Sequence, residues 1–544
     1  MKFKSILISM LAVAALASCS KEEAGTTTPD TPDTPDMKGK TAYLSVKINA
    51  PQVIGTYAPP GTDQGTDSES GIYKIIVIGF DNANTIVEKK TLSLDEQGTV
   101  GGVVAPGVGG SVSTAVTGEA FKVSSDLKKI LVVANPTGSF ETMINNVATT
   151  TYADLNAAFT ESISNLTSVG GPGTTGFMMT SAGVLAGDMG MTAVLPAIAA
   201  SSATADVNAA KNQAKTNAAV VNLDRVVAKM KVDISSIAVS NGTKTGNPSW
   251  ILTGTNSKFY PYAELASGYT GQGKYRVDPN FTGVVNTIDP DLSWEHNTSI
   301  TLNCAPGTFS ITGSGWHGTT STIYTLENTV GGTYHSGNTT QALIAVRYTP
   351  TVIPAITPGE SWFRFNGQIK TLTELDADYT TLASVVAAPG SPADKTKKSF
   401  EAFLDAVLGD SRTIGWTSES LATTVSIADL DAIPNGGYKA TQTGTEDYMI
   451  EYFQNSVCFY PVLIEHDNNL TGDAMGHWGI VRNNSYTINV QTISQPGRPY
   501  APDPSDTTIK DPQNGMIPND KSNAYIAVRI DVNAWATWNQ DVNL

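Results

Sequence analysis

Apolar and polar residues alternate along much of this chain, and the alternation is clearest near its two ends. Residues 43–50 read YLSVKINA and residues 525–532 read YIAVRIDV. In each segment one phase is apolar: Leu44, Val46, Ile48 and Ala50 in the first, and Ile526, Val528, Ile530 and Val532 in the second. A period of two residues predicts a half-buried strand in both places.

The two segments also match each other position by position, since Tyr525 corresponds to Tyr43, Val528 to Val46 and Arg529 to Lys47. A groove in a sheet selects a strand by its length, its phase and the side chains that its pockets admit. The two ends of the chain are therefore able to fill the same groove. The alternative is that both are ordinary strands of a β-rich protein and that the match is chance.

Alternation continues between the two ends and predicts an all-β fold with minor helices. The expected strands are 73–80, 85–94, 129–134, 227–232, 250–253, 299–303, 341–349, 363–367, 456–464 and 485–490. Helical periodicity is confined to Tyr152–Phe159 and Phe400–Leu408, where apolar residues recur at intervals of three and four. The second of these helices is expected to pack on the second domain.

A chain of 544 residues exceeds what one hydrophobic core usually supports, which predicts two domains with tails. The boundary is placed before residue 223, giving an N-terminal β-sandwich at 41–222 and a C-terminal one at 223–494. A loop rich in Pro, Gly and acidic residues follows the first strand at 51–71 and has no Lys or Arg, which makes it a candidate processing site. Six prolines mark 495–521 as a linker ahead of the last strand, 522–544, which is therefore expected to be displaced from the rest of the chain or only loosely packed on it.

The first forty residues predict export. Lys2 and Lys4 precede a short apolar run that ends in Leu16-Ala-Ser-Cys19, so residues 1–19 are a signal peptide. The last four resemble a bacterial lipobox, which makes Cys19 the expected site of lipidation. The residues after it resemble an acidic surface-export tag, and 20–40 form a polar stalk with three Thr-Pro-Asp repeats. The precursor is expected to be anchored to the outer membrane, exposed at the surface.

Charge and motifs narrow the function further. A net charge of −16 disfavours nucleic acid as a partner. No phosphate loop, nucleophile elbow or zinc helix is found, and the sequence predicts neither an enzyme nor a cofactor. His466, between Glu465 and Asp467, is the best metal candidate, but a solvated turn is the simpler interpretation. Trp294, Trp316 and Trp478 are expected in the core, and Cys304 and Cys458 are either buried thiols or a disulfide.

Several segments, taken in order, resemble the type V pilins (fimbrillins) of Bacteroidota, most closely the major subunit of the short (minor) fimbriae. The resemblance spans most of the chain. It rests on the lipobox, on FMMTS at 177–181, KNQAK at 211–215, RVVAK at 225–229 and VRNNSY at 481–486, and on the C-terminal end with its Pro-rich linker, Val532, Trp535 and DVNL at 541–544.

This resemblance implies two transthyretin-like Greek-key β-sandwich domains and a lipoprotein precursor that loses its first strand to a protease. Another subunit's C-terminal strand then fills the groove, with Tyr525, Ile526, Val528, Ile530, Val532 and Trp535 as donor residues. The implied partners are identical or related pilin subunits in a fimbria, with host or bacterial surface ligands for adhesion and biofilm formation. One departure is that no Arg precedes Arg225, whereas relatives are cut after arginine. The alternative is a monomeric surface lipoprotein that binds glycans or host protein.

Overall fold

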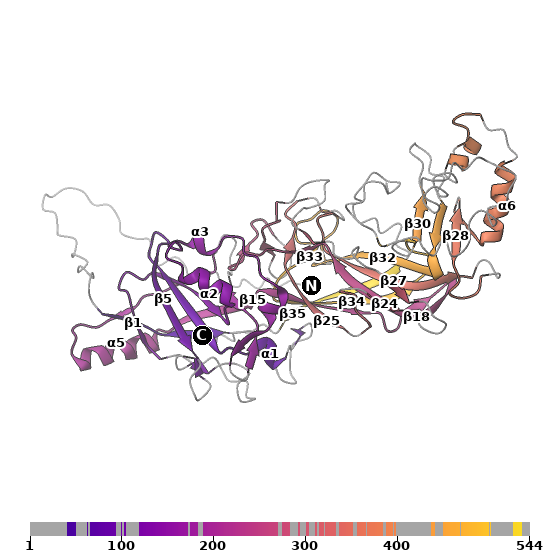
Figure 1. Ribbon diagram of the computed structural model, residues 1–544. Helices are drawn as coiled ribbons and strands as arrows, with labels where there is room; N and C mark the ends of the chain where they lie inside the picture. Colours follow the sequence, from indigo (N-terminus) through magenta and orange to yellow (C-terminus); the bar gives the residue numbers. More distant parts are fainter. Residues whose placement is uncertain are drawn as a thin grey trace, which may run out of the picture. The chain divides into compact units, whose positions relative to one another are not determined.

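The computed structural model describes residues 41–535, apart from longer gaps at 50–61, 105–118, 283–291, 294–300, 399–436, 441–449 and 502–525 and shorter gaps elsewhere. Among these residues strands far outnumber helices, which confirms the prediction of an all-β fold with minor helices (Figure 1). No helix in the described part of the chain is both long and apolar enough to cross a membrane.

The first part of the chain builds a large mixed sheet. Its strands are β2 (Val46–Asn49), β4 (Lys74–Phe80), β5 (Ile86–Ser93), β9 (Lys129–Ala134), β12 (Met179–Ser181), β13 (Thr192–Ala193) and β15 (Ala219–Arg225). Their order is β2-β15-β12-β9-β4-β5, with β13 paired to β9. The apolar runs of β4 and β9 are buried on both faces, as expected of central strands covered on two sides.

Short elements cover this sheet. A small sheet of β1 (Ala42–Leu44), β8 (Phe121–Val123) and β14 (Ala197–Ile198) adds Leu44 and Val123 to the same core. The helices α2 (Gly138–Asn145), α3 (Tyr152–Leu155) and α4 (Ile163–Thr167) bury Phe140, Leu155 and Leu166 in it. Each of these helices begins after a Thr or Ser whose side chain accepts a backbone N–H of the first turn, which fixes its start.

The second part of the chain is a sandwich of two sheets. One sheet contains β16 (Val227–Asp233), β17 (Ala238–Val239), β25 (Thr322–Leu326), β34 (Asn484–Ile493), β35 (Ile526–Trp535) and β3 (Thr62–Asp63). The other contains β18 (Gly242–Thr253), β27 (Gln341–Pro350) and β32 (Val457–Leu463). Met230 and Ile488 from the first sheet pack with Trp250 and Ile344 from the second in one core.

A further sheet is inserted between β27 and β32. It contains β28 (Trp362–Phe365), β29 (Gln368–Lys370), β30 (Gly437–Ala440) and β31 (Ile450–Phe453), accompanied by α6 (Leu372–Ala383). Trp362 and Phe453 stack with ring centroids 3.8 Å apart and an interplanar angle of 8°. This stack joins the insertion to the core of the sandwich, to which both residues belong.

Short two-stranded ladders and one turn of 3₁₀ helix complete the described elements. They are β6 (Thr99–Val100) with β7 (Val103–Val104), β10 (Val169–Gly171) with β11 (Thr174–Gly176), β19 (Thr255–Asn256) with β22 (Leu292–Ser293), β20 (Glu264–Leu265) with β21 (Arg276–Val277), β23 (Thr301–Asn303) with β24 (Ser310–Thr312), β26 (Asn328–Thr329) with β33 (Gly479–Ile480), and η3 (Gln454–Ser456).

The sequence predicted most long strands well but not the helices. The predicted strand at 129–134 coincides with β9, whereas the predicted helix from Tyr152 ends at Leu155. The predicted helix at Phe400–Leu408 lies outside the described residues. The sequence analysis did not predict α6 or α5 (Thr204–Thr216), whose buried side is made of Ala210 and Ala214. The core of the first part also contains Val227, Phe259, Tyr262 and Leu326, which follow the predicted boundary before residue 223; that boundary stays a prediction.

Candidate assembly site: the first strand, its groove and the last strand

The first strand runs through two sheets in succession. β1 lies between β14 and β8, antiparallel to both, with Tyr43 opposite Ala197 and Lys122. After Ser45, the chain continues as β2, which pairs in parallel with β15 and forms the edge of the large sheet. The N–H of Ala219 donates to the carbonyl of Ser45 at 2.9 Å, so the ladder is held even at the crossing. Strands β8, β14 and β15 therefore border this segment.

The side chains of the first strand belong to the core of the first part. Leu44, Val46 and Ile48 are buried in it, as the alternation predicted. Burying each is worth roughly 1.5–3 kcal/mol. Removing the segment would leave an apolar groove open to solvent. Ala50, the fourth predicted position, lies outside the described residues.

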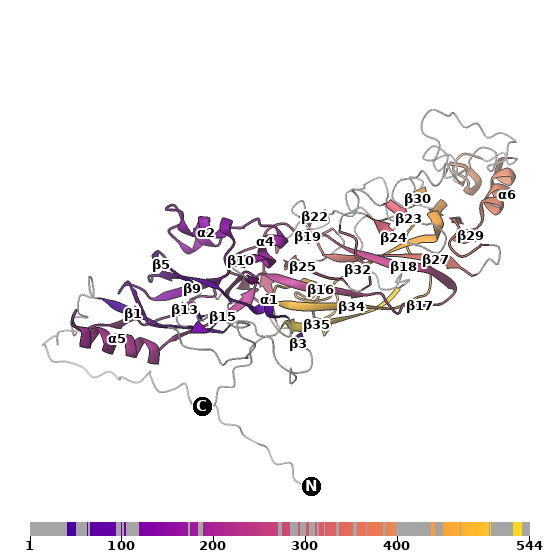
Figure 2. The ribbon, with the colours of Figure 1, turned by 60° about the horizontal axis from the view of Figure 1, so that its bottom comes forward.

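Helix α5 covers Tyr43, on the side of β1 away from this core. Tyr43 packs in a small cluster with Ala197, Ala199, Ala210 and Ala214. The Nζ atom of Lys211 lies 5.5 Å from the centroid of the Tyr43 ring, in the range of a cation–π contact. Figures 1 and 2 show α5 beside β1 in both views. The small alanine side chains leave room for one aromatic ring between helix and strand.

The last strand is paired within its own chain. β35 lies antiparallel to β34, with Ile530 in register with Ile488 and Val528 with Val490. The prediction that 522–544 is displaced from the rest, or only loosely packed on it, is therefore wrong for 526–535. The physical reason is that β34 offers a free ladder of matching length. The described start of the predicted linker also packs on its own domain: Arg498 exchanges backbone hydrogen bonds with Phe459, and Ala501 is buried.

The predicted processing loop touches the last strand. Thr62 and Asp63 of β3 pair in parallel with Ala534 and Trp535, on the side of β35 away from β34. A short helix, α1 (Asp67–Ser70), follows and buries Glu69. The Glu69 carboxylate accepts the Tyr324 hydroxyl at 2.6 Å and lies 3.3 Å from the Lys229 Nζ. The end of the loop is thus fixed on the sheet that holds the last strand.

Buried polar residues link the strand beside the groove to the strand beside the last strand. Asn483, just before β34, accepts from Arg225 Nη1 at 3.2 Å and donates to Asp224 at 3.1 Å. Arg225 also donates to the carbonyl of Glu69 at 2.6 Å. Asp224 and Arg225 end β15, so the two strands that neighbour the chain's two similar segments share one hydrogen-bonded network.

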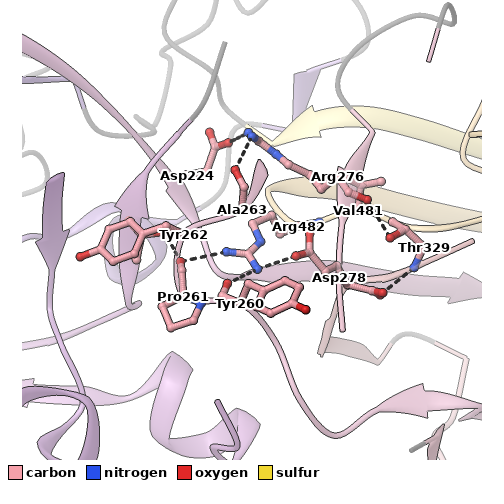
Figure 3. A network of polar contacts seen from close by, with 12 residues as sticks. Asp224, Tyr260, Pro261, Tyr262, Ala263, Arg276, Asp278, Thr329, Val481 and Arg482 are labelled. Carbon is pink, nitrogen blue, oxygen red and sulfur yellow. Dashed lines mark hydrogen bonds and ion pairs between the residues drawn. The ribbon is translucent and has the colours of Figure 1, made fainter. Parts of the chain in front are cut away.

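Two further buried arginines extend this network (Figure 3). Arg276 is ion-paired with Asp224 and donates to the carbonyl of Ala263. Arg482 lies 2.5 Å from Glu327 and donates to the carbonyls of Tyr260 and Pro261. Removing one partner of an ion pair this deeply buried strongly destabilises the folded protein, because the other charge is left buried and unpaired.

Asp278 lies nearby and differs from the paired acids. Burial, and secondly the charge of Glu327, raise the pKa of its carboxyl well above the usual range. It accepts from the backbone N–H groups of Thr329 at 2.8 Å and Asn280 at 2.9 Å. The bond from Thr329 anchors β26, while that from Asn280 is local to the chain after Asp278.

The other predicted site residues are accounted for as follows. Cys19 and Tyr525 lie outside the described residues, as do Cys304 and Trp294, while Cys458 is a free buried thiol. Trp478 is buried and Trp316 half-buried. The solvated turn expected at His466 is wrong: its Nδ1 lies 2.7 Å from the Tyr486 hydroxyl in the core. Among the described residues no cluster of three metal-ligating side chains occurs.

The sequence pattern alone did not predict α5 or the buried network. Ala210 and Ala214, four residues apart, were the signal for α5, but two alanines make a narrow apolar stripe. Arg225, Arg276 and Arg482 are each nearly inaccessible to solvent, yet a single arginine in a sequence carries no sign of burial. Their partners lie up to 258 residues away in sequence.

Comparison with known families matches the two regions that hold these strands. Residues 42–225 match the family described as "Major fimbrial subunit protein (FimA)", and 451–541 match "Major fimbrial subunit protein type IV, Fimbrillin, C-terminal". Together they span half of the chain, and each includes one of the two similar segments. No curated protein sequence matches the chain.

Solved structures that match this chain over most of its length share little sequence with it. A candidate cell adhesion protein from Parabacteroides distasonis is 12% identical (TM-score 0.40; 91% of this chain and 99% of the other covered). A fimbrilin from Porphyromonas gingivalis is 13% identical (0.36; 92% and 98%), and the tip fimbrial protein Mfa3 from the same organism, C-terminally truncated, is 12% identical (0.32; 91% and 100%). TM-scores below 0.5 carry no argument about this chain, so the assignment rests on the two family matches. By these matches, the chain belongs to the fimbrillin family of fimbrial subunit proteins.

Proposed function

We propose that this protein is a structural subunit of a cell-surface fimbria that polymerises by donor-strand exchange. The observation that carries the proposal is the first strand, which is buried in the core, is paired with β8, β14 and β15, and continues along the chain into the 51–71 loop. Cleavage there would free a segment whose removal opens a groove along β8, β14 and β15. The neighbouring subunit's last strand has the residues to fill it.

The energetics favour such a joint. A donor strand would restore three or four buried apolar side chains, each worth roughly 1.5–3 kcal/mol, and the main-chain ladders on both sides of β1. An open groove is costly because unpaired strand edges and apolar surface face water. The exchange therefore trades an internal strand for an equivalent external one.

The cis pairing of β35 adds a step to this exchange. The strand must leave β34 before it reaches a neighbour. The undescribed 502–525 is long enough for this, because 24 extended residues span roughly 80 Å. We infer that the cis ladder is the resting position of the donor and that the groove of a processed neighbour is the better site. Leaving β34 costs β35 the hydrogen bonds of that ladder, and burial of its apolar side chains in the neighbour's closed groove offsets this loss.

Export and processing complete the proposal. Cys19 would carry the lipid of an outer-membrane precursor, and a protease would act within 51–71. Since this loop contains no Lys or Arg, we infer that the protease does not require a basic residue. A cut before Thr62 would leave β3 and Glu69 on the mature subunit. The resulting fimbria would support adhesion and biofilm formation through host or bacterial surface ligands.

The pairing of β35 also favours a second candidate, a monomeric surface lipoprotein that binds glycans or host protein. Its nine register pairs with β34 would then be the strand's permanent position. Under this alternative the linker serves only to return the chain to its own sheet. The two candidates differ in whether the tail is needed for association between subunits.

Deletion of Ser522–Leu544 separates them. The truncated chain, cut in the 51–71 loop at an inserted protease site, should stay folded and form no ladders in mildly heated detergent gels. A peptide of residues 522–544 should bind the cut chain far more tightly than the uncut chain, in which the β34 edge is free but the groove is occupied. Equal binding to both forms, with no ladders from the cut full-length chain, would favour the monomer.

A further inference from the structure

The groove of the first strand has two positions that admit only small side chains. Ala42 and Ser45 are both 0% exposed, Ala42 inside the β14-β1-β8 sheet and Ser45 at the crossing between β1 and β2. Protein interiors are packed closely enough that an added methylene group at such a site is destabilising. Because Ser45 is fully buried, a ring or a long charged chain at position 45 would have to displace its closely packed neighbours.

Position 43, by contrast, requires a large aromatic side chain. Tyr43 fills the space under α5 that four alanines leave, with Lys211 over its face. A small side chain there would leave a cavity under the helix, and cavities in cores are destabilising. The groove thus requires a small residue at positions 42 and 45, an aromatic residue at 43, and an apolar residue at 44, 46 and 48. Position 47 accepts other side chains, since Lys47 is only half-buried.

One other segment of the chain meets these demands in order. Residues 524–530 read AYIAVRI beside AYLSVKI at 42–48. Building on the proposed function, we propose that the groove accepts the last strand of a second copy of this chain in one register, with Ala524 at the position of Ala42, Tyr525 under α5 and Ala527 at the position of Ser45. Ala527 and the Tyr525 pocket are the specificity determinants.

Other registers of the donor strand in the groove are disfavoured, and those slipped by two residues are disfavoured at position 45. A slip of one residue turns the apolar side chains away from the core. A slip of two residues keeps the phase, but in one direction it places Tyr525 at the position of Ser45, and in the other it places Arg529 there and Ile526 at that of Ala42. A buried charge or an over-sized ring is costly in a closed site. Position 45 therefore acts against both slips.

The register predicts which residues face each other across two subunits. Lys47 pairs with Val220 and Asn49 with Asn222 on β15. Arg529 of a donor would thus lie opposite Val220, and Asp531 opposite Asn222. Val220 and Asn222 are exposed, so cysteines there should not disturb the core. In its own chain Arg529 pairs with Asn489 on β34, far along the sequence from both.

Disulfide trapping tests the register. Full-length chains with a protease site inserted between Pro59 and Pro60 would carry one added cysteine each, Val220→Cys or Asn222→Cys in one preparation and Arg529→Cys or Asp531→Cys in the other. The preparations are mixed in pairs, cut, oxidised and run on non-reducing gels. The unmodified cut chain controls for the native cysteines. Because the added cysteines are on different chains, a link between them joins two subunits.

The matched pairs, Val220→Cys with Arg529→Cys and Asn222→Cys with Asp531→Cys, should give yields at least about tenfold above the crossed pairs, as expected if a slip costs 1.4 kcal/mol or more. Each crossed pair reports one direction of slip. Crossed yields equal to or above the matched ones would overturn the register while strand exchange stands. Ladders without any of the four links would place the donor elsewhere and overturn the proposal. The absence of ladders from every cut chain would instead refute the proposed function.

Discussion

The first and last strands have nearly the same sequence but different surroundings. Residues 42–49 cross from an antiparallel sheet to the parallel edge of another, with a break at Ser45. Residues 526–535 form one continuous strand that is antiparallel to β34 and parallel to β3, and the ladder to β34 shifts register between Val490 and Thr492 of β34. The first strand is thus broken at its small residue Ser45, whereas the last strand is unbroken at the corresponding Ala527 and the extra residue lies on its partner.

This difference shows what an alternating pattern determines. It fixes which residues face a core. It does not fix the direction of the partner strand or the sheet that is joined. One sequence pattern is therefore compatible with two sites, which is what a strand that exchanges between subunits requires.

The largest contrast is expected from charges placed in each strand. Val528→Asp with Ile530→Asp should abolish ladders, because two carboxylates would enter a dry groove at several kcal/mol each. Val46→Asp with Ile48→Asp is the matched variant: it should lower the melting temperature of the uncut chain, yet allow ladders once the strand has been cut away. Ladder gels and melting curves of the two variants and the parent chain give the result. Equal ladder formation by both variants would mean that the two strands do not share a groove.

The buried network beside β34 should be the next most sensitive place. Arg482→Met leaves Glu327 buried without its partner and should cost about 3–5 kcal/mol of unfolding free energy, measured in urea. Adding Glu327→Gln to that variant should recover part of the loss. If Arg482→Met were as stable as the parent chain, the pair would not be buried as described.

Acid should loosen the site of the last strand more than the groove of the first. Burial lowers the pKa of His466 to about 4, although the charge of Asp467 opposes the shift. An unfolded histidine titrates near pH 6.5, so the unfolded state binds a proton first as the pH falls. The contribution of neutral, buried His466 to the free energy of unfolding is complete above pH 6.5 and decreases by about 1.4 kcal/mol per pH unit down to about pH 4.

Hydrogen exchange reads this out strand by strand, since His466 contacts Tyr486 on β34. Between pH 7 and pH 5 the protection factors of the β34 amides should decrease more than those of the β15 amides. His466→Gln should remove most of that difference. An equal loss of protection in both strands, unchanged by the variant, would contradict the assignment to His466.

The smallest expected effect concerns the cover of the Tyr43 ring. Lys211→Ala removes a cation over its face and should destabilise the uncut chain by about 0.5–1 kcal/mol. Lys211→Arg keeps the cation and should be close to neutral. Thermal melting of the three chains at low and high salt checks the electrostatic origin.

Local pattern was sufficient for the strands because their apolar phase is visible residue by residue. It predicted β9 to the residue, and it identified Leu44, Val46 and Ile48 as core residues. It failed where the deciding contact is distant in sequence. The burial of Arg225 depends on Asn483 and Glu69, and the position of β35 depends on the free edge of β34. Neither edge nor partner can be read from the strand itself.

The most direct test of the account is the covalent structure of the subunit inside the assembled fimbria. N-terminal sequencing together with the intact mass, on fimbriae sheared from cells, identifies both ends of the chain at once. The account predicts an N-terminus within 51–71 and a C-terminus that still includes 522–544. Fimbriae built from subunits that begin at Cys19 and retain residues 41–50 would contradict it.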